Sequence, residues 1–113
     1  AAASCAFALD LQPYSADALD GAQRAGRPVA LFFHADWCPV CQAQRKVFEQ
    51  LQAESGLDIT ILQADFDRER ELRRRLKVRT QSTLIVYRGA DEKMRAVAAI
   101  DADTLRNVLK SAF

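Results

Sequence analysis

An apolar run, VALFFHA at Val29–Ala35, leads directly into the cysteine motif DWCPVC at Asp36–Cys41. The run has no alternation of polar and apolar residues, which indicates a central strand buried on both faces. Pro39 suits the first position of a helix, because its missing N–H would be unpaired there anyway. The sequence therefore predicts a buried strand, a cysteine pair and a helix in immediate succession.

The rest of the 113-residue chain predicts a single domain with the element order α-β-α-β-α-β-β-α. Strands separated by helices pair in parallel, and the short link Gly89–Asp91 makes the last two strands an antiparallel hairpin. We therefore predict an α/β fold with a mixed four-stranded sheet and helices on both faces. Strands are expected at residues 29–35, 58–64, 83–88 and 94–99. Helices are expected at 15–25 with Ser15 as the cap, at 39–54, at 67–76 with Asp67 as the cap, and after a cap at Asp101 or Asp103.

The two cysteines of the motif have the spacing and the position of a redox pair. Cys38 and Cys41 lie one helical turn apart on the same side, so their sulfurs can form a local disulfide. Cys38 stands where the helix begins, and the unpaired N–H groups and positive dipole end of the helix favour a thiolate there. We therefore expect an exposed, nucleophilic Cys38 and a resolving Cys41 that breaks the mixed disulfide.

Three other interpretations of this pair fit less well. A zinc site needs about four ligands, and the chain offers only the pair, the distant Cys5 and its single histidine, His34. A c-type haem site needs a histidine directly after the second cysteine, where Gln42 stands. A static disulfide over so short a loop would restrain the unfolded chain little. We therefore predict a redox-active dithiol that needs no metal or other cofactor.

The segment VALFFHADWCPVCQAQRKVFEQL resembles the first central strand, the Trp-Cys-x-x-Cys active site and the long helix of the thioredoxin superfamily. The likeness spans about Leu9 to Phe113, and the runs ADWC and CPVC resemble exported bacterial members. It implies a thioredoxin-like fold and a thiol–disulfide oxidoreductase that acts on protein dithiols and disulfides as a monomer, on the reducing or isomerising side. Electrons would come from a partner dithiol, such as a membrane electron-donor protein.

One departure from the family pattern lies in the loop before the third predicted strand. The family has a cis-proline there, and Ser82 takes its place in this chain. Without proline, a cis Gln81–Ser82 bond would cost about 3–4 kcal/mol, so we expect it to be trans. The resemblance implies that the backbone of Gln81 pairs with a substrate strand. Ser82 is either a hydroxyl donor to the Cys38 thiolate or an ordinary loop serine.

The second departure concerns the proton relay of the resolving cysteine. The family's buried acid lies six residues before the first cysteine, where this chain has Phe32, and the lysine that often accompanies that acid matches Gln63. Cys41 would need water or another base to lose its proton. The resemblance therefore predicts slow resolution and long-lived mixed disulfides.

Residues next to the cysteines have candidate supporting roles. His34 is either a titratable neighbour of the thiolate or, as we favour, a packed ring at the strand end. We expect Trp37 to shield the disulfide and form part of the substrate surface, and Asp36 to be a solvated turn residue. Pro39 and Val40 lie between the cysteines and should influence the redox potential.

The first eight residues, AAASCAFA, are small and apolar. Ala6-Phe7-Ala8 has the small-x-small form of a signal-peptidase site, so we expect residues 1–8 to be the tail of an export signal or a disordered terminus. The thioredoxin-like domain would occupy residues 9–113, and Cys5 would have no role. This predicts a periplasmic or otherwise exported protein, with a cytoplasmic one as the alternative.

A run of seven basic residues, RERELRRRLKVR, occupies Arg68–Arg79. The interleaved glutamates and the lack of aromatic residues argue against nucleic acid, and docking of an acidic partner is one interpretation. An alternative to the enzyme is a Cu(I)-binding or redox-sensing module, in which Ser82 in place of proline leaves an open face over the two thiolates.

Overall fold

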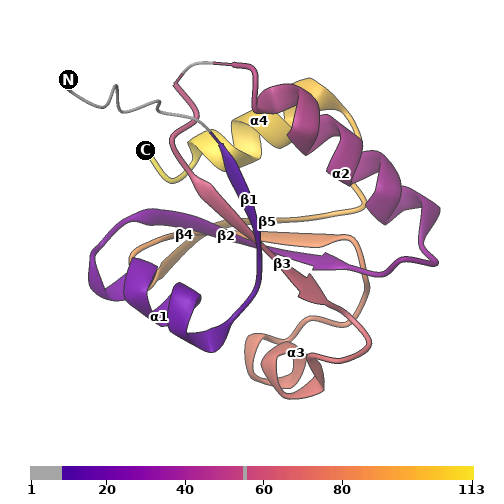
Figure 1. Cartoon of the computed structure of the whole chain (residues 1–113), viewed down its shortest axis with the longest axis horizontal. Helices are drawn as coiled ribbons and strands as arrows, with labels where there is room; N and C mark the ends of the chain where they lie inside the picture. The colour runs from indigo at the N-terminus through magenta and orange to yellow at the C-terminus, as the bar shows by residue number, and fades with distance from the viewer. Residues whose placement is uncertain (1–8, 55) are drawn as a thin grey trace.

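The computed structural model describes residues 9–54 and 56–113, so the predicted leader and Cys5 lie outside the described residues. Five strands form one mixed sheet in the order β1-β3-β2-β4-β5, with helices on both faces (Figure 1). The predicted α/β fold is confirmed. The strands are β1 (Asp10–Pro13), β2 (Pro28–His34), β3 (Thr60–Asp65), β4 (Thr83–Arg88) and β5 (Asp91–Val97), and the helices are α1 (Ala16–Arg24), α2 (Pro39–Leu51), α3 (Arg70–Leu76) and α4 (Ala102–Lys110).

The predicted strand count of four is wrong, because β1 adds a fifth strand at the sheet edge. β1 pairs in parallel with β3 alone, and three of its four residues are exposed. Asp10, Leu11 and Gln12 alternate between polar and apolar, but a run of only four residues that ends in a proline is too short to be distinguished from a loop by sequence. The central pairing is as expected, because β2 and β3 are parallel and β4 and β5 are antiparallel.

The central strand β2 is buried on both faces, as its apolar run predicts. Ala30 and Phe32 contribute to a core with α2 and α4, whereas Val29, Leu31 and Phe33 contribute to a second core with α1 and α3. Full burial of a valine, leucine or phenylalanine side chain stabilises the folded state by about 1.5–3 kcal/mol. This two-sided burial holds the end of β2, and hence the start of α2, in a rigid frame.

Several element boundaries differ from the predicted ones. The helix after the cysteine motif ends at Leu51 rather than near residue 54, and β5 begins at Asp91 rather than Met94. The caps Ser15 and Asp101 are confirmed, since their side chains accept hydrogen bonds from the N–H groups of Ala18 and Thr104. Across the described residues, no helix is long and apolar enough to cross a membrane.

Candidate redox site

Cys38 is the N-cap residue of α2, directly after the turn that follows β2. Its backbone is extended, and its Sγ accepts a hydrogen bond from the N–H of Cys41 at 3.2 Å. The sulfur thus occupies the place that a serine or aspartate oxygen usually takes at a helix start. Pro39, exposed at the first helical position, supports this geometry, and the half-buried Val40 packs against the core. A negative charge on this sulfur would be stabilised by the helix N-terminus.

The cysteine pair is less accessible than the sequence suggests. Cys38 is only 2% exposed and Cys41 is 0% exposed, whereas Trp37 before them is 60% exposed. The expectation of an exposed Cys38 is therefore wrong. A capping side chain turns back toward the N–H groups of its own helix rather than toward solvent, which accounts for the difference.

Cys41 lies in an environment that keeps its thiol protonated. Burial, followed by a hydrogen bond with the Cys38 side chain, raises the pKa of Cys41 from its ordinary value of 9.0 to about 11. The thiol also donates to the carbonyl of Phe33, with sulfur and oxygen 3.9 Å apart. Backbone groups of Ala35 and Ser82 act on this pKa in the opposite direction, but burial prevails.

The two positions where the family pattern has a proton relay are occupied by Phe32 and Gln63, which do not titrate. Phe32 is fully buried, and its ring makes edge-to-face contacts with the rings of Phe48 and His34, with centroids 5.0 and 5.4 Å apart. The side-chain oxygen of Gln63 accepts a hydrogen bond from the guanidinium of Arg45 at 2.6 Å. Neither position supplies a buried acid or a lysine that could take the proton of Cys41.

His34 is a packed ring at the end of β2. It is 6% exposed, and its Nδ1 lies 3.6 Å from a carboxylate oxygen of Asp36, which is itself exposed as expected. Burial lowers the pKa of His34, and the nearby Asp36 carboxylate opposes that shift. The ring is thus held mainly neutral near pH 7.

This shift predicts that the domain loses stability on acidification. Because the folded pKa of His34 is lowered below its ordinary 6.5, its contribution is fully present above that pH and is lost as the pH falls through the folded pKa. A His34→Phe variant should lose part of this dependence. Urea unfolding of both proteins at about pH 7.5 and about pH 5 measures the difference, and an identical pH dependence in the two would contradict the role given to His34.

The loop that faces the cysteines has an unusual backbone at Ser82. No peptide bond among the described residues is cis, so Gln81–Ser82 is trans as expected. Ser82 has a left-handed φ of 63°, its N–H donates to the Phe33 carbonyl at 2.8 Å, and its carbonyl accepts from the N–H of Ala98 at 3.0 Å. Its hydroxyl donates to the carbonyl of the half-buried Gln81. It therefore does not serve as a donor to Cys38 in this arrangement.

Gln44 is a site residue that the sequence analysis missed. It is 0% exposed, and its amide nitrogen donates to the carbonyls of Ser82 at 3.1 Å and Ala99 at 3.0 Å. This side chain connects α2, which carries Cys41, to the Ser82 loop and to the segment after β5. The spacing of Gln44 from Cys41 and Phe48 places it on the buried face of the helix, where a polar side chain needs partners, and that is the signal that could have revealed it.

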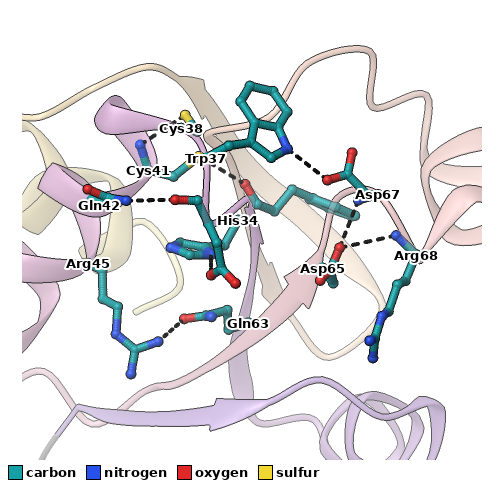
Figure 2. A network of polar contacts seen from close by, with 12 residues as sticks. His34, Trp37, Cys38, Cys41, Gln42, Arg45, Gln63, Asp65, Asp67 and Arg68 are labelled. Atoms are coloured by element: carbon teal, nitrogen blue, oxygen red, sulfur yellow. Dashed lines mark hydrogen bonds and ion pairs between the residues drawn. The ribbon is translucent and has the colours of Figure 1, made fainter.

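Asp67 is a second missed residue. Its carboxylate accepts a hydrogen bond from the indole N–H of Trp37 at 2.8 Å (Figure 2). The prediction that Asp67 caps the next helix is wrong, because that helix begins after Glu69, which makes no side-chain cap bond. Asp65 instead accepts from the N–H groups of Asp67 and Arg68, which forms a turn before the helix.

Together, the sheet order, the cysteine pair at the start of α2 and the loop opposite it define a dithiol site on a thioredoxin-like fold. Residues 16–111 match the family described as Thioredoxin. The chain belongs to the thioredoxin family.

Individual relatives agree with this membership. Thioredoxin of Mycobacterium bovis is 31% identical over 75 residues, covering 66% of this chain and 65% of that protein. Thioredoxin 2 of Plasmodium falciparum is 25% identical over 100 residues, covering 88% and 64%. The chain thus spans just under two thirds of the length of these two relatives. The crystal structure of Trxlp from Edwardsiella tarda EIB202 is similar with a TM-score of 0.82 and 32% identity, covering 88% of this chain and 98% of that one.

Proposed function

We propose that this protein is a thiol–disulfide oxidoreductase that exchanges disulfides with protein substrates through Cys38 and Cys41. The observation that carries the proposal is the Sγ of Cys38 at the N-cap of α2, where it accepts the N–H of Cys41 at 3.2 Å. This position brings the sulfur to the N–H groups and the positive dipole end of the helix, next to the second thiol. The second thiol is one turn away, within reach of the first.

The proposed reaction transfers two electrons in two exchanges. The Cys38 thiolate attacks one sulfur of a substrate disulfide, a mixed disulfide forms, and the other substrate sulfur leaves as a thiolate that takes up a proton. Cys41 then loses its proton to water and attacks the Cys38 sulfur. The Cys38–Cys41 disulfide forms and the second substrate thiolate leaves. A partner dithiol restores the reduced pair.

We place the activity on the reducing or isomerising side. Burial and the absence of an acid at Phe32 slow the deprotonation of Cys41, so a mixed disulfide on Cys38 persists. A persistent mixed disulfide gives a second thiol of the substrate time to attack, which is the step that isomerises a wrong disulfide. Membership of the thioredoxin family supports thiol–disulfide exchange itself, in either direction.

We further propose that the protein acts outside the cytosol as a monomer and draws electrons from a membrane donor. The support is the small-x-small pattern at Ala6–Ala8 and the ADWC and CPVC runs of the sequence. The Cu(I) alternative gains no support, because it depended on open space over the sulfurs. Cys38, Cys41 and Ser82 are all buried instead.

A glutathione redox titration tests the proposed function. Samples equilibrated at stepped ratios of reduced to oxidised glutathione are quenched and alkylated with a mass-adding reagent, and the two cysteines are expected to become protected together. Cys38→Ser should leave no pair that cycles, and Cys5 should remain alkylated at every ratio. If Cys38 and Cys41 stay alkylated under oxidising conditions, or oxidise independently of one another, the proposed function is wrong.

A further inference from the structure

We propose that a basic surface beside the redox site docks acidic protein partners, a proposal that rests on the proposed function and names its substrate class. Residues 68–79 carry seven basic and two acidic side chains, a surplus of five positive charges. The net charge of the chain is only +1, so the remaining residues carry a net charge of −4. The basic surface comprises the exposed side chains Arg68, Arg70, Arg74, Arg75, Lys77 and Arg79.

Most of these cations are not neutralised within the protein. Arg74 pairs with Glu71 at 3.1 Å, and the half-buried Arg73, which is not part of the surface, stacks over the ring of Phe66 at 3.8 Å. The other five members of the basic surface form no ion pair with any residue in 9–54 or 56–113. Their charge is therefore available to an incoming partner.

The basic surface adjoins the cysteine pair at both of its ends. At its beginning, Asp67 next to Arg68 binds the indole of Trp37, the residue before Cys38 (Figure 2). β2 and β3 are parallel, with His34 opposite Asp65. The segments that lead to α2 and to α3 therefore both leave the sheet at the carboxyl ends of these strands (Figure 1). A partner disulfide that reaches Cys38 thus approaches within range of these charges.

At its other end, the basic surface leads into the loop that covers the cysteines. The chain runs from Arg79 to Ser82, whose N–H binds the Phe33 carbonyl that also accepts from the Cys41 thiol. A partner that contacts Arg79 therefore lies two residues from Gln81, whose backbone is expected to pair with the substrate. The surface and the site form one continuous contact region.

The chemistry of the surface favours an acidic protein over a nucleic acid. The carboxylates of Asp65, Asp67 and Glu69 lie close to the cations in the sequence and would repel a continuous phosphate backbone. The six side chains of the basic surface include no aromatic ring, and the exposed ring of Trp37 beside them is held by the Asp67 carboxylate next to the cysteines. Exposed ion pairs add little affinity each, whereas a patch of one sign accelerates encounter with an opposite one. The expected effect is therefore on the rate of exchange, with strong dependence on salt.

Two disulfide peptides that differ only in flanking residues test this proposal. One carries glutamates and the other lysines around the same disulfide, and the reduced protein is mixed with each at low and high ionic strength. At low salt the acidic peptide should react about five- to tenfold faster. This preference should nearly vanish at about 0.5 M salt, where charges more than a few ångströms apart are screened.

Two double variants with the same change of net charge show whether the basic surface causes the preference for the acidic peptide. Arg70→Glu with Arg75→Glu should abolish the preference for the acidic peptide. Lys93→Glu with Lys110→Glu makes the same change of net charge at two exposed cations on β5 and α4, and it should leave the preference in place. A neutral aromatic disulfide should react at the same rate with all three proteins, because no charge steers it.

Three outcomes would overturn the docking surface. The first is equal rates with both peptides while the neutral disulfide still reacts, which leaves the proposed function standing. The second is an equal loss of preference in the two double variants, which would make net charge alone responsible. The third is stronger inhibition by a short single-stranded DNA than by a polyglutamate peptide of the same charge, which would favour nucleic acid. Failure to react with any disulfide, the neutral one included, would overturn the proposed function as well.

Discussion

Resolution of a mixed disulfide on Cys38 is expected to accelerate about 1,000-fold between about pH 7 and about pH 10, without reaching a plateau. The pKa of the attacking Cys41 is raised to about 11, chiefly by burial, so its thiolate fraction grows about tenfold with each pH unit over this range. A thiol with the ordinary value of 9.0 would level off near that pH. The hydrogen bond of the Cys41 thiol with the Cys38 side chain changes once the Cys38 sulfur is in a mixed disulfide, but burial, the larger cause of the raised pKa, remains.

At neutral pH the same shift makes resolution slow, though less slow than the thiolate fraction alone suggests. A rise of two units makes the Cys41 thiolate about 100-fold rarer, while the greater basicity of that thiolate raises its nucleophilicity about tenfold. We therefore expect a net slowing of about tenfold near pH 7. On this balance, we expect the raised pKa of Cys41 to prolong the mixed disulfide without abolishing turnover.

A pH-jump experiment measures this rate. The mixed disulfide with an uncharged cysteine peptide is formed, held at acid pH and transferred to buffers of rising pH, and release of the peptide is followed by mass spectrometry after an acid quench. Cys41→Ser provides the control, because its mixed disulfide should persist over the whole range. A plateau below about pH 9 would show that Cys41 ionises as an ordinary thiol and would contradict the role given to its burial.

The features that were predictable from the sequence depend on neighbours in the chain. The buried β2, the helix start at Pro39 and the spacing of Cys38 and Cys41 are each local patterns, and the structure places all of them as expected. The departures at Phe32 and Ser82 were also visible, because each occupies a position defined by its distance from the motif or the following strand.

Most of the features that were missed depend on contacts between distant segments. Gln44 gains its role from the carbonyls of Ser82 and Ala99, which lie far from it in the sequence. β1 becomes a strand only because the edge of β3 is available to it. The low exposure of Cys38 follows from a capping bond whose direction the residue pattern does not encode. Sequence periodicity places Gln44 on the buried face of its helix, but it does not give the partners of Gln44, the pairing of β1 or the direction of the Cys38 side chain.

Replacing Ser82 by proline, the residue that the family pattern has at this position, is expected to destabilise the domain by about 3 kcal/mol or more. Proline fixes φ near −65°, whereas Ser82 has a φ of 63°. It also lacks the N–H that binds the Phe33 carbonyl at 2.8 Å. Adopting the proline φ would turn the Ser82 carbonyl away from its two donors, Gln44 and Ala98. Leaving the buried Ser82 carbonyl without a donor would cost about 1–3 kcal/mol more.

Ser82→Gly is the matched control, because it keeps the N–H and permits the left-handed backbone. A non-glycine residue in this conformation costs about 1–2 kcal/mol, and the greater freedom of glycine in the unfolded chain offsets about half of that gain. The free energy of unfolding should therefore be unchanged or higher by up to about 1 kcal/mol. Urea unfolding of the parent protein, Ser82→Pro and Ser82→Gly measures these changes in the free energy of unfolding. A proline variant as stable as the parent would mean that the loop readily adopts another backbone, and that the hydrogen bonds of Ser82 with Phe33, Gln44 and Ala98 do not hold the segment over the cysteines in place.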